Sequence, residues 1–72
     1  MQTLGQRLRV LRDEEGLSRE KAAAAVHITS RTLQRYENDE REPTASIILA
    51  LARYFGVTTD YLLGNSEEEL PP

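Results

Sequence analysis

The sequence lacks cysteine and any long apolar run, and both absences limit what the protein can be. Without cysteine the 72-residue chain has neither a disulfide framework nor a thiolate metal site, so its core must depend on side-chain packing alone. Such a chain suits a reducing compartment. The N-terminal stretch MQTLGQRLRVLRDEE lacks the run of roughly 7–15 apolar residues that a signal peptide needs, and no segment is long enough to span a bilayer. We therefore expect a cytoplasmic protein with no membrane partner.

The charged residues are distributed unevenly along the chain. A net charge of −3 argues at first sight against a nucleic-acid partner, because nucleic-acid-binding domains are usually basic. Residues 1–38, however, contain seven basic and five acidic side chains, whereas residues 39–72 contain two basic and seven acidic ones. Three of the late acids lie in SEEELPP, residues 66–72, which we expect to be a polar tail or the start of a linker after a domain of residues 1–65. The first half of the chain can therefore still meet a polyanion.

Apolar residues recur at helical spacing throughout, with no strand-like alternation and no internal repeat. Serine or threonine precedes the apolar segments and glycine follows several of them, as is typical of helix boundaries. We expect an all-α fold, a compact five-helix bundle, and no enzymatic activity, because so short a domain has little core to support a catalytic cleft. The expected helices span residues 3–15, 19–26, 30–37, 45–55 and 59–63, and the last four have Ser18, Thr29, Thr44 and Thr58 as N-caps.

The third expected helix has a basic face opposite its apolar one. With Leu33 and Tyr36 toward the core, the helical rotation of about 100° per residue directs Gln34 and two arginines to solvent. These arginines, Arg31 and Arg35, are like charges at i,i+4, which costs a helix about 0.2–0.5 kcal/mol unless an anion lies across them. Two arginines alone are more often an ordinary solvated face. Here a helix and a short turn precede them, and this helix-turn-helix order indicates DNA as the anion.

The segment LSREKAAAAVHITSRTLQRYEN, followed by REPT, ALARYFGV and TTDYLLG, resembles the phage-repressor and Cro type of helix-turn-helix domain, the XRE family. The resemblance covers residues 4–64. It implies a bundle of the lambda-repressor-like type, in which the second helix lies across the DNA backbone and the third enters the major groove. It also implies a sequence-specific transcriptional regulator, a repressor, that binds a pseudo-palindromic double-stranded operator as a homodimer and needs no cofactor.

The resemblance further implies which residues contact DNA. Residues of the third helix would read base edges, since arginine can bind guanine O6 and N7 in bidentate fashion and glutamine can bind adenine N6 and N7. Residues at the start of the second helix and around the third would bind phosphate. Arg12 and Glu37 would form a partly buried ion pair with a structural role. The expected base-contacting residues are Ser30, Arg31, Gln34 and Arg35, and the expected phosphate-contacting residues are Ser18, Arg19, Thr29, Asn38 and Arg41.

Four features depart from the family pattern. Arg19 stands where glutamine is usual and keeps a phosphate donor. His27 stands at the usual glycine of the turn, so we expect a strained left-handed backbone there; a lone histidine without a second ligand does not indicate a metal. Residues 22–25 are all alanine, which favours helix and close packing. Asp39-Glu40 replaces Gly-Lys, and these acids would either repel phosphate or merely cap and solubilise the turn.

A second hypothesis is a protein-interaction or antitoxin-type module with weak or no DNA binding. The acidic balance and the Asp39-Glu40 pair favour it. The convergence of Arg19, Arg31 and Arg35 on one side opposes it, because a cluster of arginines is typical of a surface that meets phosphate. DNA binding is therefore the preferred hypothesis.

Overall fold

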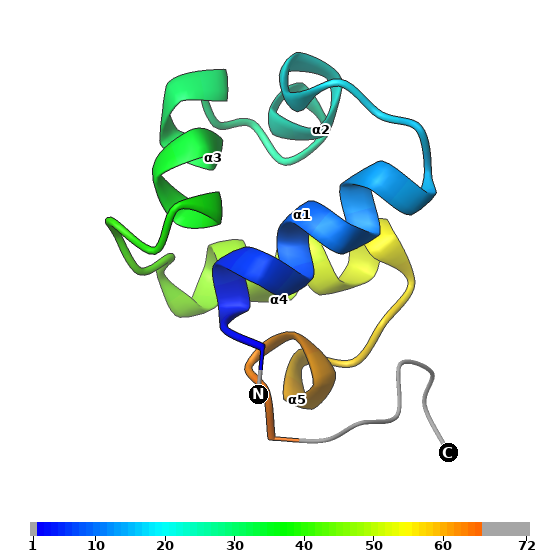
Figure 1. Cartoon of the computed structure of the whole chain (residues 1–72), viewed down its shortest axis with the longest axis vertical. Coiled ribbons are helices and arrows are strands. Elements are labelled where there is room, and N and C mark those ends of the chain that lie inside the picture. Colours follow the sequence, from blue (N-terminus) through cyan, green and yellow to red (C-terminus); the bar gives the residue numbers. More distant parts are fainter. Residues whose placement is uncertain (1, 66–72) are drawn as a thin grey trace.

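A computed structural model of the chain describes residues 2–65, which form five α-helices and, within that range, no strand (Figure 1). The expected all-α bundle is confirmed, and each helix begins and ends within one residue of its expected bounds. The tail expected at residues 66–72 lies outside the described residues. Among the helices of the described part, none combines the length and the apolar character needed to cross a membrane. The helices are α1 (Leu4–Glu14), α2 (Arg19–Ala25), α3 (Ser30–Glu37), α4 (Ala45–Phe55) and α5 (Thr59–Leu62).

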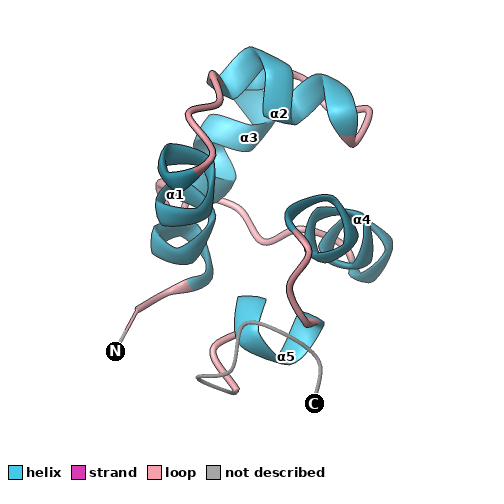
Figure 2. Ribbon diagram, turned by 90° about the vertical axis from the view of Figure 1, so that its right-hand side faces the viewer, coloured by secondary structure: helices cyan, strands magenta, loops and turns pink. Residues whose placement is uncertain are grey.

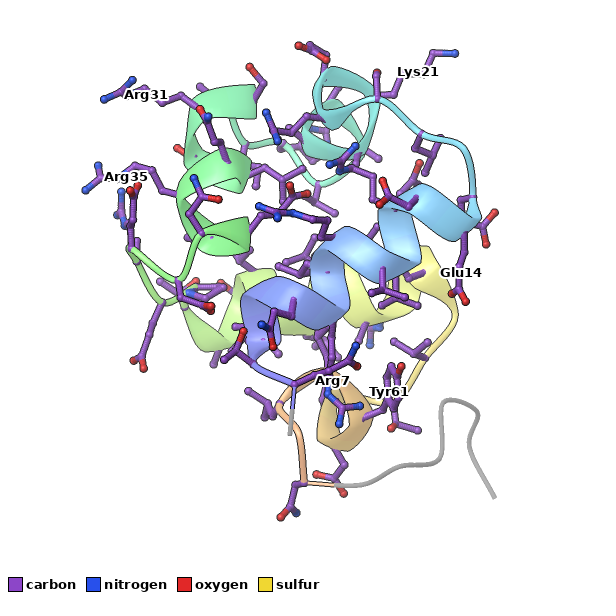
Figure 3. The ribbon with its side chains drawn as sticks, viewed as in Figure 1. Arg7, Glu14, Lys21, Arg31, Arg35 and Tyr61 are labelled. Carbon is purple, nitrogen blue, oxygen red and sulfur yellow. The ribbon has the colours of Figure 1, made fainter. Side chains whose placement is uncertain are left out.

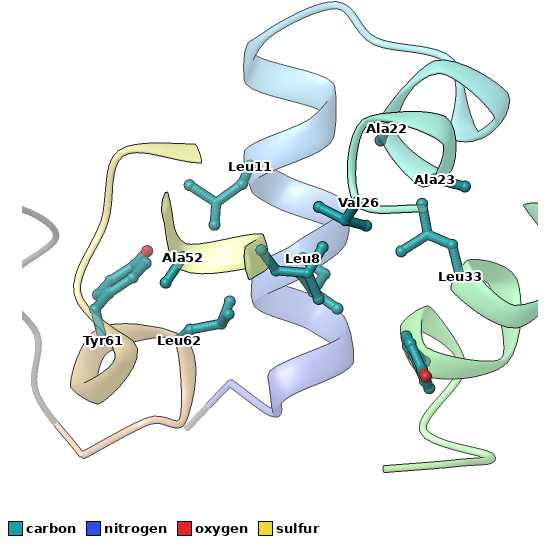
Figure 4. Packing of buried hydrophobic residues seen from close by; sticks show 11 residues of the cluster. Leu8, Leu11, Ala22, Ala23, Val26, Leu33, Ala52, Tyr61 and Leu62 are labelled. Carbon is teal, nitrogen blue, oxygen red and sulfur yellow. The ribbon is translucent and has the colours of Figure 1, made fainter. Parts of the chain in front are cut away.

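Helix α1 contacts one helix of each of two packed pairs, and in Figure 2 it lies across the molecule from α4, with α2 and α3 above and α5 below. Helices α2 and α3 pack against each other and α1 contacts α3; α4 and α5 form the other pair, and α1 contacts α5. All five helices contribute to one apolar core (Figure 4). Two of the four alanines of α2 are buried in it, so α2 can lie close to its neighbours. The core consists of Leu8, Leu11, Ala22, Ala23, Val26, Leu33, Tyr36, Leu51, Ala52, Tyr61 and Leu62.

Every helix begins with a serine or threonine whose side-chain oxygen accepts a hydrogen bond from the backbone N–H of the third helical residue. Such a cap contributes about 1 kcal/mol to stability. Four of these caps were expected and are confirmed. The fifth, Thr3, was missed because the sequence pattern places residue 3 inside the helix. Thr3 and Gln6 form a capping box, in which the Gln6 side chain accepts from the Thr3 N–H in return.

The turn between α2 and α3 contains a left-handed residue, His27, with φ 60°. The positive φ expected at this position is confirmed. The N–H of Ile28 donates to the carbonyl of Ala23 (3.0 Å), and the N–H of His27 donates to that of Ala24 (3.2 Å), the pairing of a Schellman motif. The His27 side chain is exposed. Backbone hydrogen bonds, rather than the imidazole, therefore set the path from α2 to α3.

Helix α1 approaches the end of α3 so closely that a glycine is required at the crossing. A Cβ built on Gly5 would lie 2.7 Å from the Glu37 carbonyl oxygen and closer still to that of Tyr36. Protein interiors are close-packed, and such backbone atoms cannot move aside without displacing a helix. The sequence pattern gave no signal for this contact, because a glycine in a helix looks locally like a poor helix former. Gly5 thus sets the position of α1 on α3.

Replacing His27 with glycine should raise the free energy of unfolding by up to about 1 kcal/mol, because glycine adopts positive φ without the steric cost of a Cβ. In a domain of this size that corresponds to an increase in Tm of about 4–8 °C, measurable by circular dichroism. The His27→Ala variant is the control, because it keeps the Cβ and should not rise above the wild-type Tm. A lower Tm for the glycine variant would show that the imidazole makes a stabilising contact.

Replacing Gly5 with alanine should lower the free energy of unfolding by about 1–3 kcal/mol, because the added methyl group meets backbone oxygens of α3. Helix propensity alone predicts the opposite sign, a gain of about 0.5–1 kcal/mol. Chemical denaturation distinguishes the two. Stability equal to or above that of the wild type would mean that the crossing of α1 and α3 imposes no constraint at this position.

Candidate nucleic-acid interface

Helix α3 turns a basic face to solvent. Its residues Leu33 and Tyr36 are buried in the core, whereas Arg31 and Arg35 are exposed and project from the same side of the molecule (Figure 3). Gln34 is exposed as well. Neither arginine forms an ion pair with any of residues 2–65. The two guanidinium groups are therefore available to an external anion.

The hydroxyl groups at the starts of α2 and α3 differ in whether their proton is still available to an external acceptor. Thr29 Oγ1 accepts from the Thr32 N–H and also donates to Thr32 Oγ1 at 2.9 Å, so its proton is used within the helix. Ser18 Oγ accepts from the Lys21 N–H and retains its own proton for another acceptor. Ser30, the first residue of α3, is half-buried. The geometry therefore suits Ser18 for a phosphate contact better than Thr29.

One carboxylate holds three guanidinium groups at the end of α3. The side chain of Glu37 has no exposed surface. Arg12 binds it twice, from Nε to Oε2 at 2.7 Å and from Nη2 to Oε1 at 3.1 Å. Arg19 Nε donates to Oε1 at 3.2 Å, and Arg9 Nε lies 4.0 Å from the same oxygen. Helices α1, α2 and α3 are thus tied together at a single buried anion.

The Arg12 guanidinium is held in its charged form. Its hydrogen bonds to Glu37 raise the pKa of Arg12 above its ordinary value and outweigh the opposing effect of burial. Because the folded-state pKa of this cation is raised, its contribution to stability is complete below the ordinary guanidinium pKa and is lost only as the pH rises through the raised value. The pair between Arg12 and Glu37 is therefore insensitive to pH changes near neutrality on the arginine side.

Two further residues lie beside the end of α3. Asn38, the C-cap of α3, is exposed and accepts a hydrogen bond at its Oδ1 from Arg9 Nη2 at 2.8 Å. Arg41 is exposed in the following loop and has no ion pair with the described residues. Arg9 comes from α1 and was not expected here, because the helix-turn-helix pattern indicates DNA contacts on the second and third helices and gives no signal for the first. The structure thus adds a third helix to the candidate interface.

Asp39 joins the loop after α3 to the start of α1. Its φ is 59°, a second left-handed non-glycine residue, and its carboxylate accepts from the Thr3 hydroxyl at 2.7 Å and the Gly5 N–H at 3.1 Å. A carboxylate at a helix N-terminus also complements the helix dipole. Asp39 therefore has a structural role at the start of α1 that neither sequence interpretation included, and phosphate repulsion by its charge stays a prediction. Of the two adjacent acids, only Glu40 has no side-chain hydrogen bond with the residues described.

Arg7 lies inside the bundle, away from this surface (Figure 3). Its guanidinium carbon is 4.4 Å from the centroid of the Tyr61 ring on α5, and the residue is only 2% exposed. A cation–π contact of this kind contributes about 0.5–2 kcal/mol. Arg7 is one of the seven basic residues in the first half of the chain. Burial removes it from the surface that a polyanion could reach.

Two helices joined by a tight turn, with a basic face on the second, define a helix-turn-helix domain. A family model described as Helix-turn-helix matches residues 8–62. The chain belongs to this helix-turn-helix family, of the phage-repressor and Cro (XRE) type. The HTH-type transcriptional regulator ImmR of Bacillus subtilis (strain 168) is 38% identical over 65 residues, which are 90% of this chain and 51% of ImmR. The chain thus spans about half the length of that relative.

Solved structures share the whole arrangement. The P22 c2 repressor protein, crystallised in complex with a synthetic operator, has a TM-score of 0.87 and 26% identity, covering 92% of this chain and 100% of that one. A transcriptional regulator from Listeria innocua has a TM-score of 0.83 and 29% identity, covering 92% of this chain and 62% of that one. The likeness therefore includes the placement of α2 and α3 on the rest of the bundle.

Replacing Asp39 with alanine should lower the free energy of unfolding by about 1–3 kcal/mol, because the Gly5 N–H and the Thr3 hydroxyl lose their acceptor. Glu40→Ala is the matched control: it removes the same charge from the next position and should change stability by less than about 0.5 kcal/mol. Urea denaturation of both variants measures the difference. Equal stabilities would mean that the carboxylate of Asp39 does not hold α1.

Proposed function

We propose that this chain is the DNA-binding part of a transcriptional repressor and that α3 reads base edges in the major groove of an operator. The observation that carries the proposal is the exposed face of α3, on which Arg31, Gln34 and Arg35 have no competing acidic partner among the described residues. The similarity to a repressor crystallised with an operator supports the same orientation of α3 toward DNA. Catalysis has no place in this function.

The side chains of α3 match the donor and acceptor pattern of the major groove. Arg31 and Arg35 can each donate two hydrogen bonds to guanine O6 and N7, and Gln34 can pair with adenine N6 and N7. Ser30 lies at the N-terminal end of the helix, which enters the groove first in this family. Around α3, phosphate would be bound by Ser18, Arg19, Asn38 and Arg41, with Thr29 contributing through its backbone, because its hydroxyl is used within α3.

We further propose that two copies bind a pseudo-palindromic operator. One module of this size makes few base contacts, and two half-sites about one helical turn apart supply the rest. Large exposed apolar side chains support a self-association surface on the last two helices: Leu49 and Tyr54 on α4 and Leu63 at the end of α5 are 43%, 40% and 53% exposed. The last part of α4 together with α5 is the proposed dimer surface.

Replacing Arg31 with alanine should cost about 1–3 kcal/mol of operator binding and relax the preference at one base position, whereas Arg41→Ala should weaken all sequences alike. Selection of bound sites from random duplex DNA identifies the operator, and titrations of operator and random DNA then measure both variants. If Arg31→Ala weakened operator and random DNA equally, Arg31 would not read a base.

The same titrations test the rival interaction module. DNA binding must weaken with salt, with a slope of log K against log salt near −0.9 for each phosphate neutralised. A wild-type chain that binds no duplex at low salt would support the protein-interaction hypothesis instead.

A further inference from the structure

The carboxylate of Glu37 gathers more positive charge than it neutralises. Guanidinium nitrogens of Arg9, Arg12 and Arg19 all lie within 4.0 Å of this one buried side chain. These three cations and the two acids paired with them, Glu37 and Asp13, leave a local charge of +1 at the end of α3. An acidic domain therefore has a concentrated positive site directly beside its exposed basic helix face.

The three arginines differ in how many N–H groups their contacts with the described residues use. Arg12 uses Nε, Nη1 and Nη2, toward Glu37 and the carbonyl of Leu17, and its side chain is 13% exposed. Arg19 uses only Nε and is 33% exposed, and Arg9 uses only Nη2 and is 49% exposed. Arg9 and Arg19 lie side by side, because the Nε of each approaches the same oxygen of Glu37. Arg12 is thus structural, while the other two keep donors at the surface.

Arg9 also orients the side chain of Asn38. Because Arg9 Nη2 donates to Oδ1 of Asn38, the amide nitrogen of Asn38 must point away from the guanidinium group. The opposite orientation would place donor against donor. The two N–H groups of this exposed amide therefore point away from Arg9 and are available to an external acceptor.

We propose that Arg9 and Arg19 form a clamp for the phosphates of one DNA strand, and that Glu37 is the positioning residue that holds both guanidinium groups toward it. The inference rests on the proposed function and deepens it by adding Arg9 and Glu37 to the interface. Guanidinium groups bind phosphate oxygens through paired N–H donors, so a group fixed at one nitrogen still has others to offer. Fixing them in advance removes much of the side-chain entropy that binding would otherwise cost.

A positioning role of Glu37 can be distinguished from a purely electrostatic effect of its negative charge, because the two predict opposite changes in DNA affinity for the Glu37→Gln variant. If Glu37 were only a negative charge near DNA, Glu37→Gln would tighten DNA binding. If Glu37 positions Arg9 and Arg19, the same variant should weaken binding, since Arg19 would lose its acceptor and Arg9 the charge that attracts it.

The experiment titrates the full chain into a fluorescent duplex of random sequence over a range of salt concentrations. Arg9→Gln should lower affinity about fivefold to tenfold at about 0.1 M salt and reduce the salt slope by about 0.9, the value for one phosphate contact. The matched control is Lys21→Gln, which removes the same charge from an exposed position of α2, outside the cluster and outside the proposed dimer surface. It should leave the slope unchanged and affinity within about twofold.

The possible outcomes test the clamp and the proposed DNA-binding function separately. Failure of the wild-type chain to bind duplex DNA overturns the proposed function itself. Wild-type binding with Arg9→Gln indistinguishable from Lys21→Gln overturns the clamp alone. For Glu37→Gln, circular dichroism first establishes whether the variant is folded at the assay temperature; weaker binding by a folded variant supports positioning, and tighter binding overturns it. If that variant does not fold, the comparison of Arg9→Gln with Lys21→Gln decides.

Discussion

The position of helix α3 depends on the buried carboxylate of Glu37. Taking an ion out of water costs several kcal/mol, so a carboxylate with no exposed surface is tolerated only because guanidinium groups surround it. Those groups come from α1 and α2, and α3 therefore cannot shift without disturbing both neighbours. Gly5 and Asp39 act at the same end of α3, where the first turn of α1 meets backbone oxygens directly and receives a carboxylate at its N-terminus. These contacts together fix the position of α3 against α1 and α2.

The structure also explains how a chain of net charge −3 can present a basic surface. Two acids near α3 make contacts within the domain. Glu37 is buried among arginines, and Asp39 accepts hydrogen bonds from Thr3 and Gly5 at the start of α1. Arg31 and Arg35 meet no acid among the described residues. Net charge governs long-range attraction, but contact with a polyanion depends on which charges reach one surface. The net charge of the chain therefore does not indicate which partner this domain binds.

Stability in so small a domain must come from many modest contributions, because its apolar core is limited. Caps at all five helix starts contribute about 1 kcal/mol each, and hydrogen-bonded turns close the helix ends. Two of these turns use a left-handed histidine or aspartate in place of glycine. Asp39 gains tertiary hydrogen bonds at its left-handed position, whereas the His27 side chain is exposed. Of the two residues, His27 is therefore the one whose replacement by glycine should raise the free energy of unfolding.

The sequence by itself determined the five helices, four of their five caps and the exposed face of α3, because these follow from local spacing: capping acts over three residues and apolar faces repeat every three or four. It also indicated the pairing of Arg12 with Glu37 through family resemblance. Only the tertiary structure decided that Arg7 is buried, that Arg9 reaches Asn38, and that Asp39 caps α1 beside Gly5. The physical reason is distance along the chain: Arg9 and Asn38 are 29 residues apart and Gly5 and Asp39 are 34 apart, and no local periodicity records which distant residues the packed helices bring together.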